Sequence, residues 1–345
     1  QRQMCIRDSI RIGVKMSVKD NVLKILENNK GQHFSGEEIA KELDVSRSAV
    51  WKAVKTLTKE GYNIVGINNK GYCMLENSDV ITREEIEKNL NKELRDKADI
   101  EVYKTITSTN AVLKKMASEG AKEWKILVAE EQTNGRGRLN RNFYSPSNSG
   151  IYMSILLKPE VISTEALFIT TMAAVAVSEA IEKLTNVKTE IKWVNDVYCN
   201  DKKVCGILTE ASLNLENGKL DYAVLGIGIN LKTPKDEFPE DIRNIAAGFM
   251  DGAEYEIENL RSRITSEVLS NIYKYYKHLE KHKFMDKYKE KSMLIGKYVY
   301  IKDKEPKEQL LVKDIDDNTA ALVVEHSDGR IEKLSTGEVS VRIMD

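Results

Sequence analysis

Residues 189–231, TEIKWVNDVYCNDKKVCGILTEASLNLENGKLDYAVLGIGINL, decide the fold of the middle of the chain. They contain three apolar runs rich in β-branched residues, which is typical of strands. Only the short polar turns CNDKK (199–203) and LENGK (215–219) separate these runs. Turns of this length join antiparallel neighbours, whereas parallel strands need a long crossover. The stretch therefore excludes a purely parallel, doubly wound sheet and predicts a mixed α+β domain.

Strand and helix signals continue on both sides of this stretch, so that the predicted central domain spans residues 99–293. Apolar β runs predict further strands at 100–106, 126–131 and 150–157. Helical spacing of apolar residues predicts helices at 109–120, 164–184 and 258–282. The last helix carries His278 and His282 one turn apart; without the H-E-x-x-H order, we interpret them as part of a solvated face.

Residues 16–76 predict three helices followed by a β-hairpin. Ser46 is placed to cap the third helix, and Gly61 is placed to end it. Two short β runs then surround a turn at 68–71. Two helices separated by a short turn, the second carrying positive charge, form the helix-turn-helix arrangement, here with a basic wing. DNA binding is therefore favoured over a helical bundle with solvated charges, through these residues: Ser46, Arg47, Ser48, Trp51, Lys52, Lys55 and Lys70.

The remaining segments are assigned by composition. Residues 1–15 lack both the apolar centre of a signal peptide and helical periodicity, so we expect them to be a non-native leader ahead of Met16. Residues 77–98 are polar and charged, which indicates a linker and one surface helix. Residues 294–345 contain five short β runs, which predict a small SH3-like β-barrel.

The bulk composition excludes several classes of protein. The formal net charge is -1, with 53 basic and 54 acidic residues, so any attraction for nucleic acid must come from a local patch. The 4 cysteines form no C-x-x-C pair, which disfavours a zinc site or a disulfide framework and favours the cytoplasm. No apolar run approaches the roughly 18 residues that would span a bilayer.

The segment TNGRGRLNR (133–141) carries the strongest chemical signal. It begins like a dinucleotide fingerprint, but Asn140 replaces the third glycine and no helix is predicted after it. From Gln132 to Gly150 there is no acidic residue. Glycines allow backbone N–H groups to approach an anion, and arginines supply charge-assisted donors. We therefore predict a mobile cationic loop that orders over a phosphorylated ligand.

Five motifs occur in the order found in biotin–protein ligases, which the chain resembles over residues 17–345. They are TSTN (107–110), EEQTNGRGRLNR (130–141), KWVND (192–196), KVCGILTE (203–210) and GIGIN (226–230). With the N-terminal DNA-binding domain and the C-terminal barrel, the resemblance is to the bifunctional ligases that also repress biotin genes. It implies that residues 99–293 are a catalytic domain with the mixed sheet of class II aminoacyl-tRNA synthetases.

The resemblance implies a reaction in two steps. Biotin and ATP, the latter with Mg²⁺, give biotinyl-5′-AMP and pyrophosphate. A lysine of biotin carboxyl carrier protein then receives the biotin. It also implies no permanently bound cofactor, no metal cage built by the protein, operator DNA as a partner, and a homodimer that forms on binding biotinyl-AMP. We expect no association with membranes.

Site residues are carried over motif by motif. Lys192, placed near the new mixed anhydride, and Arg138 are implied as catalytic. Biotin contacts are implied for Ser108, Thr109, Asn110, Gln132, Arg136, Gly137, Arg138 and Lys192. Contacts with ATP or the adenylate are implied for Arg136, Arg138, Arg141, Phe143, Asn195, Asp196 and Asn230. The glycines at 206, 226 and 228 mark close approach of the backbone to a ligand or a neighbouring strand.

The sequence departs from the family pattern at a few positions. Val194 stands where proline is usual, which is expected to loosen that turn. Asn140 and Phe143 stand where the enterobacterial form has glycine and tryptophan. Two alternatives stay open at this point: a biotin-sensing repressor without catalysis, and a lipoate-type ligase. Retention of Arg136, Arg138 and Lys192 disfavours the first, and the DNA-binding domain with the GRGR loop disfavours the second.

Overall fold

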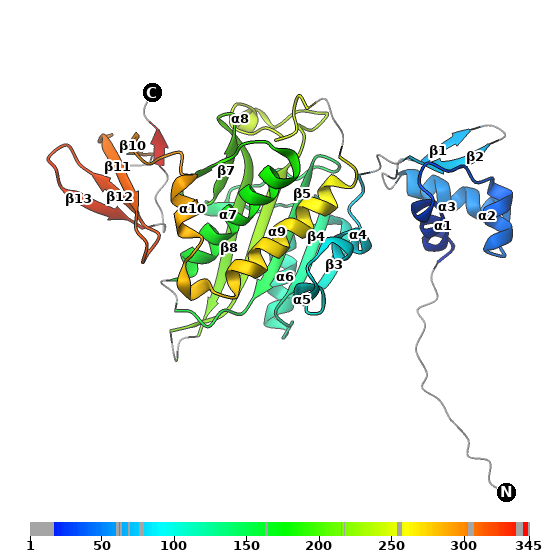
Figure 1. Cartoon of the computed structure of the whole chain (residues 1–345), viewed down its shortest axis with the longest axis horizontal. Helices are drawn as coiled ribbons and strands as arrows, with labels where there is room; N and C mark the ends of the chain where they lie inside the picture. Colours follow the sequence, from blue (N-terminus) through cyan, green and yellow to red (C-terminus); the bar gives the residue numbers. More distant parts are fainter. Residues whose placement is uncertain are drawn as a thin grey trace, which may run out of the picture. The chain divides into compact units, whose positions relative to one another are not determined.

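The computed structural model describes residues 17–343 except 60, 61, 63, 68, 69, 76–78, 163, 164, 215, 217, 254–256, 303–306 and 336–340. The chain forms two compact units, residues 1–80 and residues 81–345. The predicted leader, the helix end at Gly61 and the turn residues Asn68 and Asn69 lie outside the described residues. Figure 1 shows the elements of each unit.

The first unit contains the predicted three helices and hairpin. The helices are α1 (Val18–Asn28), α2 (Gly36–Glu42) and α3 (Arg47–Lys59), and the antiparallel strands are β1 (Ile64–Ile67) and β2 (Gly71–Met74). Apolar residues of all three helices and both strands form one buried core. The Ser46 hydroxyl accepts a hydrogen bond from the N–H of Ala49 at 3.2 Å, so the predicted cap of the third helix is confirmed.

The hairpin is anchored to the segment that leads into α2. The backbones of Phe34 and Tyr72 exchange two hydrogen bonds of 2.8 and 2.9 Å. Gly71, at the start of β2, has φ +88°, and a Cβ there would lie 2.1 Å from the Phe34 carbonyl oxygen. Only glycine fits this combination of left-handed backbone and close approach.

The second unit begins with two short helices, α4 (Arg83–Asn89) and α5 (Lys92–Arg95). Ile86, Leu90 and Leu94 are buried in the same core as the central sheet. The Ser266 hydroxyl also donates to the Ile86 carbonyl at 2.9 Å. The predicted helix starting near Thr82 is therefore present; its apolar face packs into this unit while its charged face stays exposed.

A seven-stranded mixed sheet forms the centre of the second unit, in the order β3-β4-β5-β9-β8-β7-β6. Only β3 and β4 pair in parallel; the other neighbours are antiparallel, as residues 189–231 predict. The strands are β3 (Asp99–Ile106), β4 (Lys125–Gln132), β5 (Gly150–Leu157), β6 (Glu190–Lys192), β7 (Asp196–Cys199), β8 (Lys202–Leu213) and β9 (Leu220–Asn230).

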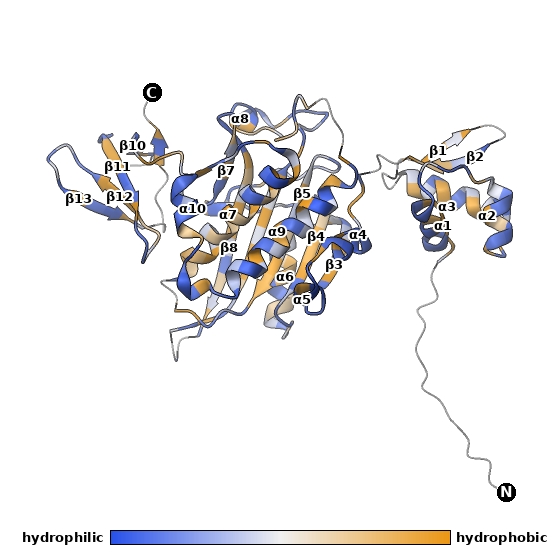
Figure 2. Cartoon of the chain, in the orientation of Figure 1, coloured by the Kyte–Doolittle hydropathy of each residue, from blue (hydrophilic) through white to orange (hydrophobic). Residues whose placement is uncertain are grey.

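Helices cover both faces of this sheet. The long helices α7 (Ala166–Thr185) and α9 (Leu260–Tyr276) cross one face together with α10 (Met285–Glu290) (Figure 1). The opposite face packs against α6 (Thr109–Ser118), whose Leu113 and Ala117 form a separate cluster with Leu127, Leu156 and Val224. The apolar colouring of the central strands in Figure 2 reflects burial on both sides.

The long helix predicted at 258–282 is shorter than the sequence indicates. It ends at Tyr276, and a short 3-10 turn, η3 (Leu279–Lys281), follows. His282 stacks on Phe168 with ring centroids 3.6 Å apart, so the interpretation of this histidine as part of a solvated face is wrong. Across the described ranges, no helix combines the length and apolarity needed to cross a membrane.

A small antiparallel sheet ends the chain, in the order β13-β12-β11-β10-β14. Its strands are β10 (Tyr298–Ile301), β11 (Leu310–Ile315), β12 (Leu322–Glu325), β13 (Ile331–Leu334) and β14 (Val341–Ile343). The indole N–H of Trp193 donates to the Ala320 carbonyl at 2.9 Å. This bond ties the small sheet to the turn after β6, and the apolar core is continuous between them.

Candidate active site

A cavity of about 240 Å³ opens in the second unit where the end of β4, the start of α6 and strands β6 to β9 meet. Every residue implied by the resemblance for biotin or ATP lines it: Ser108, Thr109, Asn110, Gln132, Arg136, Gly137, Arg138, Arg141, Phe143, Lys192, Asn195, Asp196 and Asn230. Four separate segments of the sequence thus converge on one site.

One end of the cavity is polar and ordered by hydrogen bonds. Ser108 caps α6 by accepting from the N–H of Ala111 at 3.4 Å. The N–H and hydroxyl of Thr109 both donate to Gln132 Oε1, at 2.8 and 3.1 Å. Gln132 Nε2 donates to the Ser145 hydroxyl at 3.0 Å. The helix start and the end of β4 are therefore locked together at this end.

The cationic loop after β4 folds into a hairpin of its own, containing the 3-10 turn η1 (Arg138–Asn140). The Phe143 N–H donates to the Gly135 carbonyl at 2.9 Å, and the Gly137 N–H donates to the Arg141 carbonyl at 2.8 Å. Leu139, at its tip, is 52% exposed. The loop thus presents its arginines from an ordered hairpin whose tip projects into solvent.

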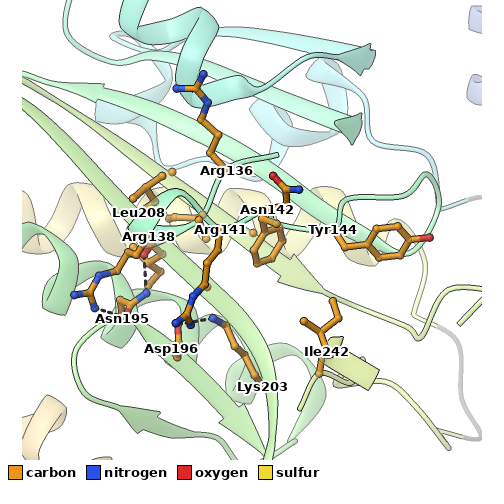
Figure 3. Close-up of a pocket in the computed structure, with 18 of the residues that line it drawn as sticks. Arg136, Arg138, Arg141, Asn142, Tyr144, Asn195, Asp196, Lys203, Leu208 and Ile242 are labelled. Atoms are coloured by element: carbon orange, nitrogen blue, oxygen red, sulfur yellow. Dashed lines mark hydrogen bonds and ion pairs between the residues drawn. The ribbon is translucent and has the colours of Figure 1, made fainter. Parts of the chain in front are cut away.

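The three arginines of the loop point in different directions (Figure 3). Arg138 is half-buried and donates to Asn195 Oδ1 at 2.9 Å, while Asn195 Nδ2 donates to the Ile207 carbonyl at 3.0 Å. Burial lowers the pKa of Arg138 from its usual value. The guanidinium nevertheless stays charged, because arginine is not deprotonated in proteins. Arg141 reaches toward Asp196, and Arg136 points away from both. The structure therefore does not place Arg136 beside the other two guanidinium groups.

Asp196 forms an ion pair with Lys203, with Oδ1 2.7 Å from Nζ. That oxygen is buried, so this ion pair with the Lys203 ammonium is shielded from solvent. Lys203 lines the cavity but is absent from the site residues that the motifs imply. The turn CNDKK is the feature of the sequence that could have predicted Lys203 in the site, because a tight hairpin brings the chain back beside KWVND.

Lys192 lies at the end of β6, half-buried, with Nζ 5.6 Å from the centre of the Tyr198 ring. Burial and the nearby charge of Arg342 lower its pKa from the usual range. Its ammonium group makes no hydrogen bond or ion pair with the residues that the structure describes. A cation held in this way, without a carboxylate partner, is suited to an anionic ligand.

Two glycines of the motifs make room for one aromatic ring. A Cβ on Gly228 would lie 2.3 Å from the Phe143 ring, and one on Gly206 would lie 3.0 Å from it. The close approach predicted at these glycines is therefore that of a side chain onto the sheet. Phe143 also contacts Tyr152 edge-on, with ring centroids 6.3 Å apart.

The turn KWVND is firmly held despite its valine. The Trp193–Val194 peptide bond is cis. The hydroxyl of buried Tyr288 donates to the Val194 carbonyl at 3.0 Å, and Trp193 bonds to Ala320 as described above. The hydrogen bond from Tyr288 holds the backbone of this turn, and the bond from the Trp193 indole holds the side chain of its second residue.

Sequence reasoning missed a wall of the cavity that comes from distant segments. After β9, the short helix α8 (Glu240–Arg243) and its flanks contribute Phe238, Ile242 and Ile245. The Lys203 N–H donates to the Ile245 carbonyl at 2.7 Å, which docks this wall on β8. Arg342 reaches the cavity from β14. Neither segment carries a motif, so only the folded chain reveals them.

The residues predicted to contact DNA lie on one element and its hairpin. Each is exposed: Ser46, Arg47, Ser48, Trp51, Lys52, Lys55 and Lys70. Trp51 is 51% exposed, and Lys55 Nζ lies 4.7 Å from its ring centre. An exposed tryptophan flanked by cations on the third helix is consistent with an interaction surface.

Residues 102–230 match the biotin/lipoate A/B protein ligase family, and residues 19–73 match an HTH domain. The bifunctional ligase/repressor BirA of Bacillus subtilis is 31% identical over 271 residues, which are 79% of this chain and 82% of that protein. The Escherichia coli protein of the same name is 31% identical over 219 residues, 62% of this chain and 65% of its own length.

A solved relative supports the same conclusion. The biotin protein ligase from Aquifex aeolicus in complex with biotin and ATP is 27% identical, with a TM-score of 0.59 over 71% of this chain and 99% of that one. The Bacillus relatives match 79% of this chain, and the HTH model matches residues 19–73 independently. The chain belongs to the family of bifunctional biotin ligase/repressor proteins.

Proposed function

We propose that this chain forms biotinyl-5′-AMP from biotin and ATP and transfers the biotin to a lysine of biotin carboxyl carrier protein. The observation that carries the proposal is the division of the cavity. A hydrogen-bonded polar end holding Ser108 and Gln132 suits a ureido ring, and an end rich in cations suits the phosphates. A sensor of free biotin needs no such group of cations.

The first step joins two anions and therefore needs fixed positive charge. The biotin carboxylate forms a bond to the α-phosphorus of ATP, and pyrophosphate leaves with the electrons of the broken P–O bond. We assign Arg138 and Lys192 to the developing charge, with the Gly137 backbone beside them. Lys203 is a further cation for the phosphates, because it lines the same cavity. Arg136 would have to turn inward as the loop closes.

The second step transfers the acyl group. The neutral amine of the acceptor lysine attacks the carbonyl carbon of the mixed anhydride, AMP leaves, and the amine proton passes to solvent. We assign the AMP half to Arg141, Phe143, Asn195, Asp196 and Asn230 at the other end of the cavity.

Mg²⁺ fits the same end of the cavity. Asp196 offers a buried carboxylate oxygen, Oδ1, whose partner here is the Lys203 ammonium at 2.7 Å. Mg²⁺ commonly takes one or two carboxylates together with the phosphates of its nucleotide, so a cage of protein ligands is not required. When bound, Mg²⁺ would neutralise phosphate charge, and Asp196 is the residue that would hold it.

Regulation follows from the two units of the chain. We propose that biotinyl-AMP retained in the cavity favours a homodimer, which pairs two α3 helices on a palindromic operator and represses biotin genes. We assign DNA binding to residues 16–76, catalysis to residues 99–293, and a small barrel to residues 294–345. We place the protein in the cytoplasm, where ATP and reducing conditions are available.

The test is to incubate the protein with ATP, Mg²⁺, biotin and a biotin-carrier domain, and to weigh the carrier by mass spectrometry. We expect a gain of one biotin, and none on a carrier whose acceptor lysine is replaced by arginine. A protein that binds biotin but never adds mass would be a sensor. A gain with lipoate and none with biotin would point to a lipoate-type ligase.

A further inference from the structure

A chain of hydrogen-bonded polar side chains runs beneath the polar end of the cavity and joins residues from three strands. It starts at Glu210 on β8, passes through Asn110 at the start of α6, and reaches Ser154 on β5. The single hydroxyl hydrogen of Ser154 is shared between Asn110 Oδ1 and Thr109 Oγ1, the latter 2.7 Å away, and the Thr109 hydroxyl in turn donates to Gln132 on β4. Neither Glu210 nor Ser154 lines the cavity, and the motif-based site residues include neither of them.

The orientation of the Asn110 amide is fixed from both sides. Its Nδ2 donates to Glu210 Oε2 at 3.1 Å and to the Leu208 carbonyl at 3.4 Å. Its Oδ1 accepts from the Ser154 hydroxyl at 2.6 Å. The amide lies directly over the sheet, since a Cβ on Gly226 would be 2.1 Å from Oδ1. Both amide hydrogens are thus used within the protein and are not available to a ligand.

The hydrogen-bond donors of Thr109 are also used within the protein. Its N–H and its hydroxyl hydrogen both go to Gln132 Oε1. The donors left at this end are the second hydrogen of Gln132 Nε2 and the hydroxyl hydrogen of Ser108, which donates to no described residue. Thr109 and Asn110 therefore hold the site in shape, while Ser108 and Gln132 remain to bind the carbonyl oxygen of a ligand.

Glu210 carries the only charge in this chain of hydrogen bonds. Lys114 donates to its other oxygen at 3.0 Å, and the Glu210 side chain is 22% exposed. Burial raises the pKa of Glu210, but the hydrogen bonds from Lys114 and Asn110 outweigh it and hold this pKa below its usual value. The carboxylate is therefore an acceptor at neutral pH, and a charge-assisted acceptor binds the Asn110 amide more strongly than a neutral one.

We propose that Glu210 is a positioning residue for biotin recognition, which acts by orienting the Asn110 amide and, through Ser154 and Thr109, the Gln132 side chain. The inference rests on the proposed biotin site. Because the chain ends at the head group of the ligand and not at the reacting carboxylate, it governs affinity for biotin and leaves the chemical step alone.

The test is a reciprocal exchange of donor and acceptor in the full-length protein. Glu210→Gln replaces the charged acceptor, and Asn110→Asp sets a second carboxylate against Glu210. We expect each variant to raise the KM for biotin roughly tenfold or more, because this is the effect expected from losing a hydrogen bond to a charged group. The kcat and the KM for ATP should stay close to wild type. The double variant restores the bond with its direction reversed, and should recover most of the biotin affinity.

Controls separate this role from a general effect on folding. Glu131→Gln removes a carboxylate on β4 that bonds to Thr105, outside the polar chain, and should leave the KM for biotin unchanged. Equal melting temperatures would show that the variants are folded. If a single variant does not fold, recovery of both fold and biotin affinity in the double variant still supports the pairing.

Two outcomes would overturn the inference: single variants that bind biotin as tightly as wild type, or a double variant as weak as the two losses combined. Failure of the proposed function looks different, because the wild-type protein would then transfer no biotin to the carrier and would have no measurable KM for biotin.

Discussion

Arg138 and Lys192 are two cations prepared for their ligand in different ways. Arg138 is held by Asn195, which is itself held by the Ile207 carbonyl, so the guanidinium is oriented before any ligand arrives. Lys192 is half-buried and has no described hydrogen-bond or ion-pair partner. A donor that is already oriented stabilises developing charge without reorganisation. We therefore assign the larger share of adenylate retention to Arg138.

Replacement of Arg138 by alanine should release the adenylate. We expect biotinyl-AMP to bind more weakly by ~2.7–4 kcal/mol, the typical cost of removing one donor that stabilises a developing negative charge. The dissociation rate of biotinyl-AMP, followed by stopped-flow fluorescence, measures this loss. Arg83→Ala, which removes an exposed arginine of α4, is the matched control and should not change the rate.

The lowered pKa of Lys192 predicts how adenylate binding depends on pH. Lys192 binds an anion only when protonated, so affinity should fall as pH rises through a pKa below the usual value of about 10.4. Lys192→Arg keeps its charge above that value, and the fall should move to higher pH. Titration of adenylate affinity in alkaline buffers tests this. Identical profiles for the two proteins would contradict the assignment.

Individual site residues were predicted only where a motif carried them. The loop and the KWVND turn led directly to Arg138, Lys192 and Asn195, which the structure brings into one cavity. Arg342 could not be found in this way, because its segment reaches the cavity through strand pairing between β10 and β14. Glu210 ends a recognised motif, but its role depends on a hydrogen bond to a residue 100 positions away.

At the scale of elements, the sequence predicted nearly every strand of the second unit, because alternation and short turns are local signals. Its errors came from packing. Ile86, Leu90 and Leu94 recur every four residues, which is the spacing of a buried face; the polar composition of residues 77–98 did not reveal that this face joins the core of the second unit. The break after Tyr276 has no proline or glycine near it; stacking of His282 on Phe168 accompanies it.

His326 links the strands of the small sheet and predicts its pH dependence. Its Nδ1 lies 2.5 Å from Glu308 Oε1, and its Nε2 lies 2.8 Å from Glu332 Oε2. These carboxylates raise the pKa of His326. A histidine whose pKa is higher in the folded state than in the unfolded state stabilises the fold. This stabilisation is complete below the unfolded-state pKa of about 6.5 and is lost as pH rises through the folded-state pKa.

The change to make is His326→Gln. We expect it to lower the melting temperature in mildly acidic buffer, where the wild-type imidazolium is bonded to both carboxylates. In alkaline buffer the two melting curves should converge. Calorimetric scans of both proteins at several pH values measure the difference, and a gap that stays constant with pH would show that the charge of His326 does not matter.

At the scale of the whole molecule, the chain joins a helix-turn-helix unit to a ligase unit. The formal net charge of -1 gives no overall attraction for DNA, so binding depends on the local group of cations on α3 and its hairpin. Both units were predicted from sequence, because each has its own core and local signals. The packing of the small sheet against the ligase sheet could not be predicted from sequence, because it depends on long-range contacts such as that of Trp193 with Ala320.

Operator binding should show the electrostatic signature of this surface. The logarithm of the DNA association constant falls linearly with the logarithm of the salt concentration. Lys52→Ala on α3 should make this slope less steep by about 0.9 if the side chain neutralises one phosphate. Fluorescence anisotropy with DNA from upstream of the biotin genes, at several salt concentrations, gives the slope. Lys122→Ala, an exposed lysine of the ligase unit, should leave it unchanged.

The central claim is that the cavity makes an acyl-adenylate, and exchange of labelled pyrophosphate into ATP tests it without an acceptor protein. The wild-type chain should catalyse exchange only when biotin is present, and Lys192→Ala should abolish it while the protein stays folded. A wild-type chain that binds biotin but shows no biotin-dependent exchange would contradict the account and leave a sensor in its place.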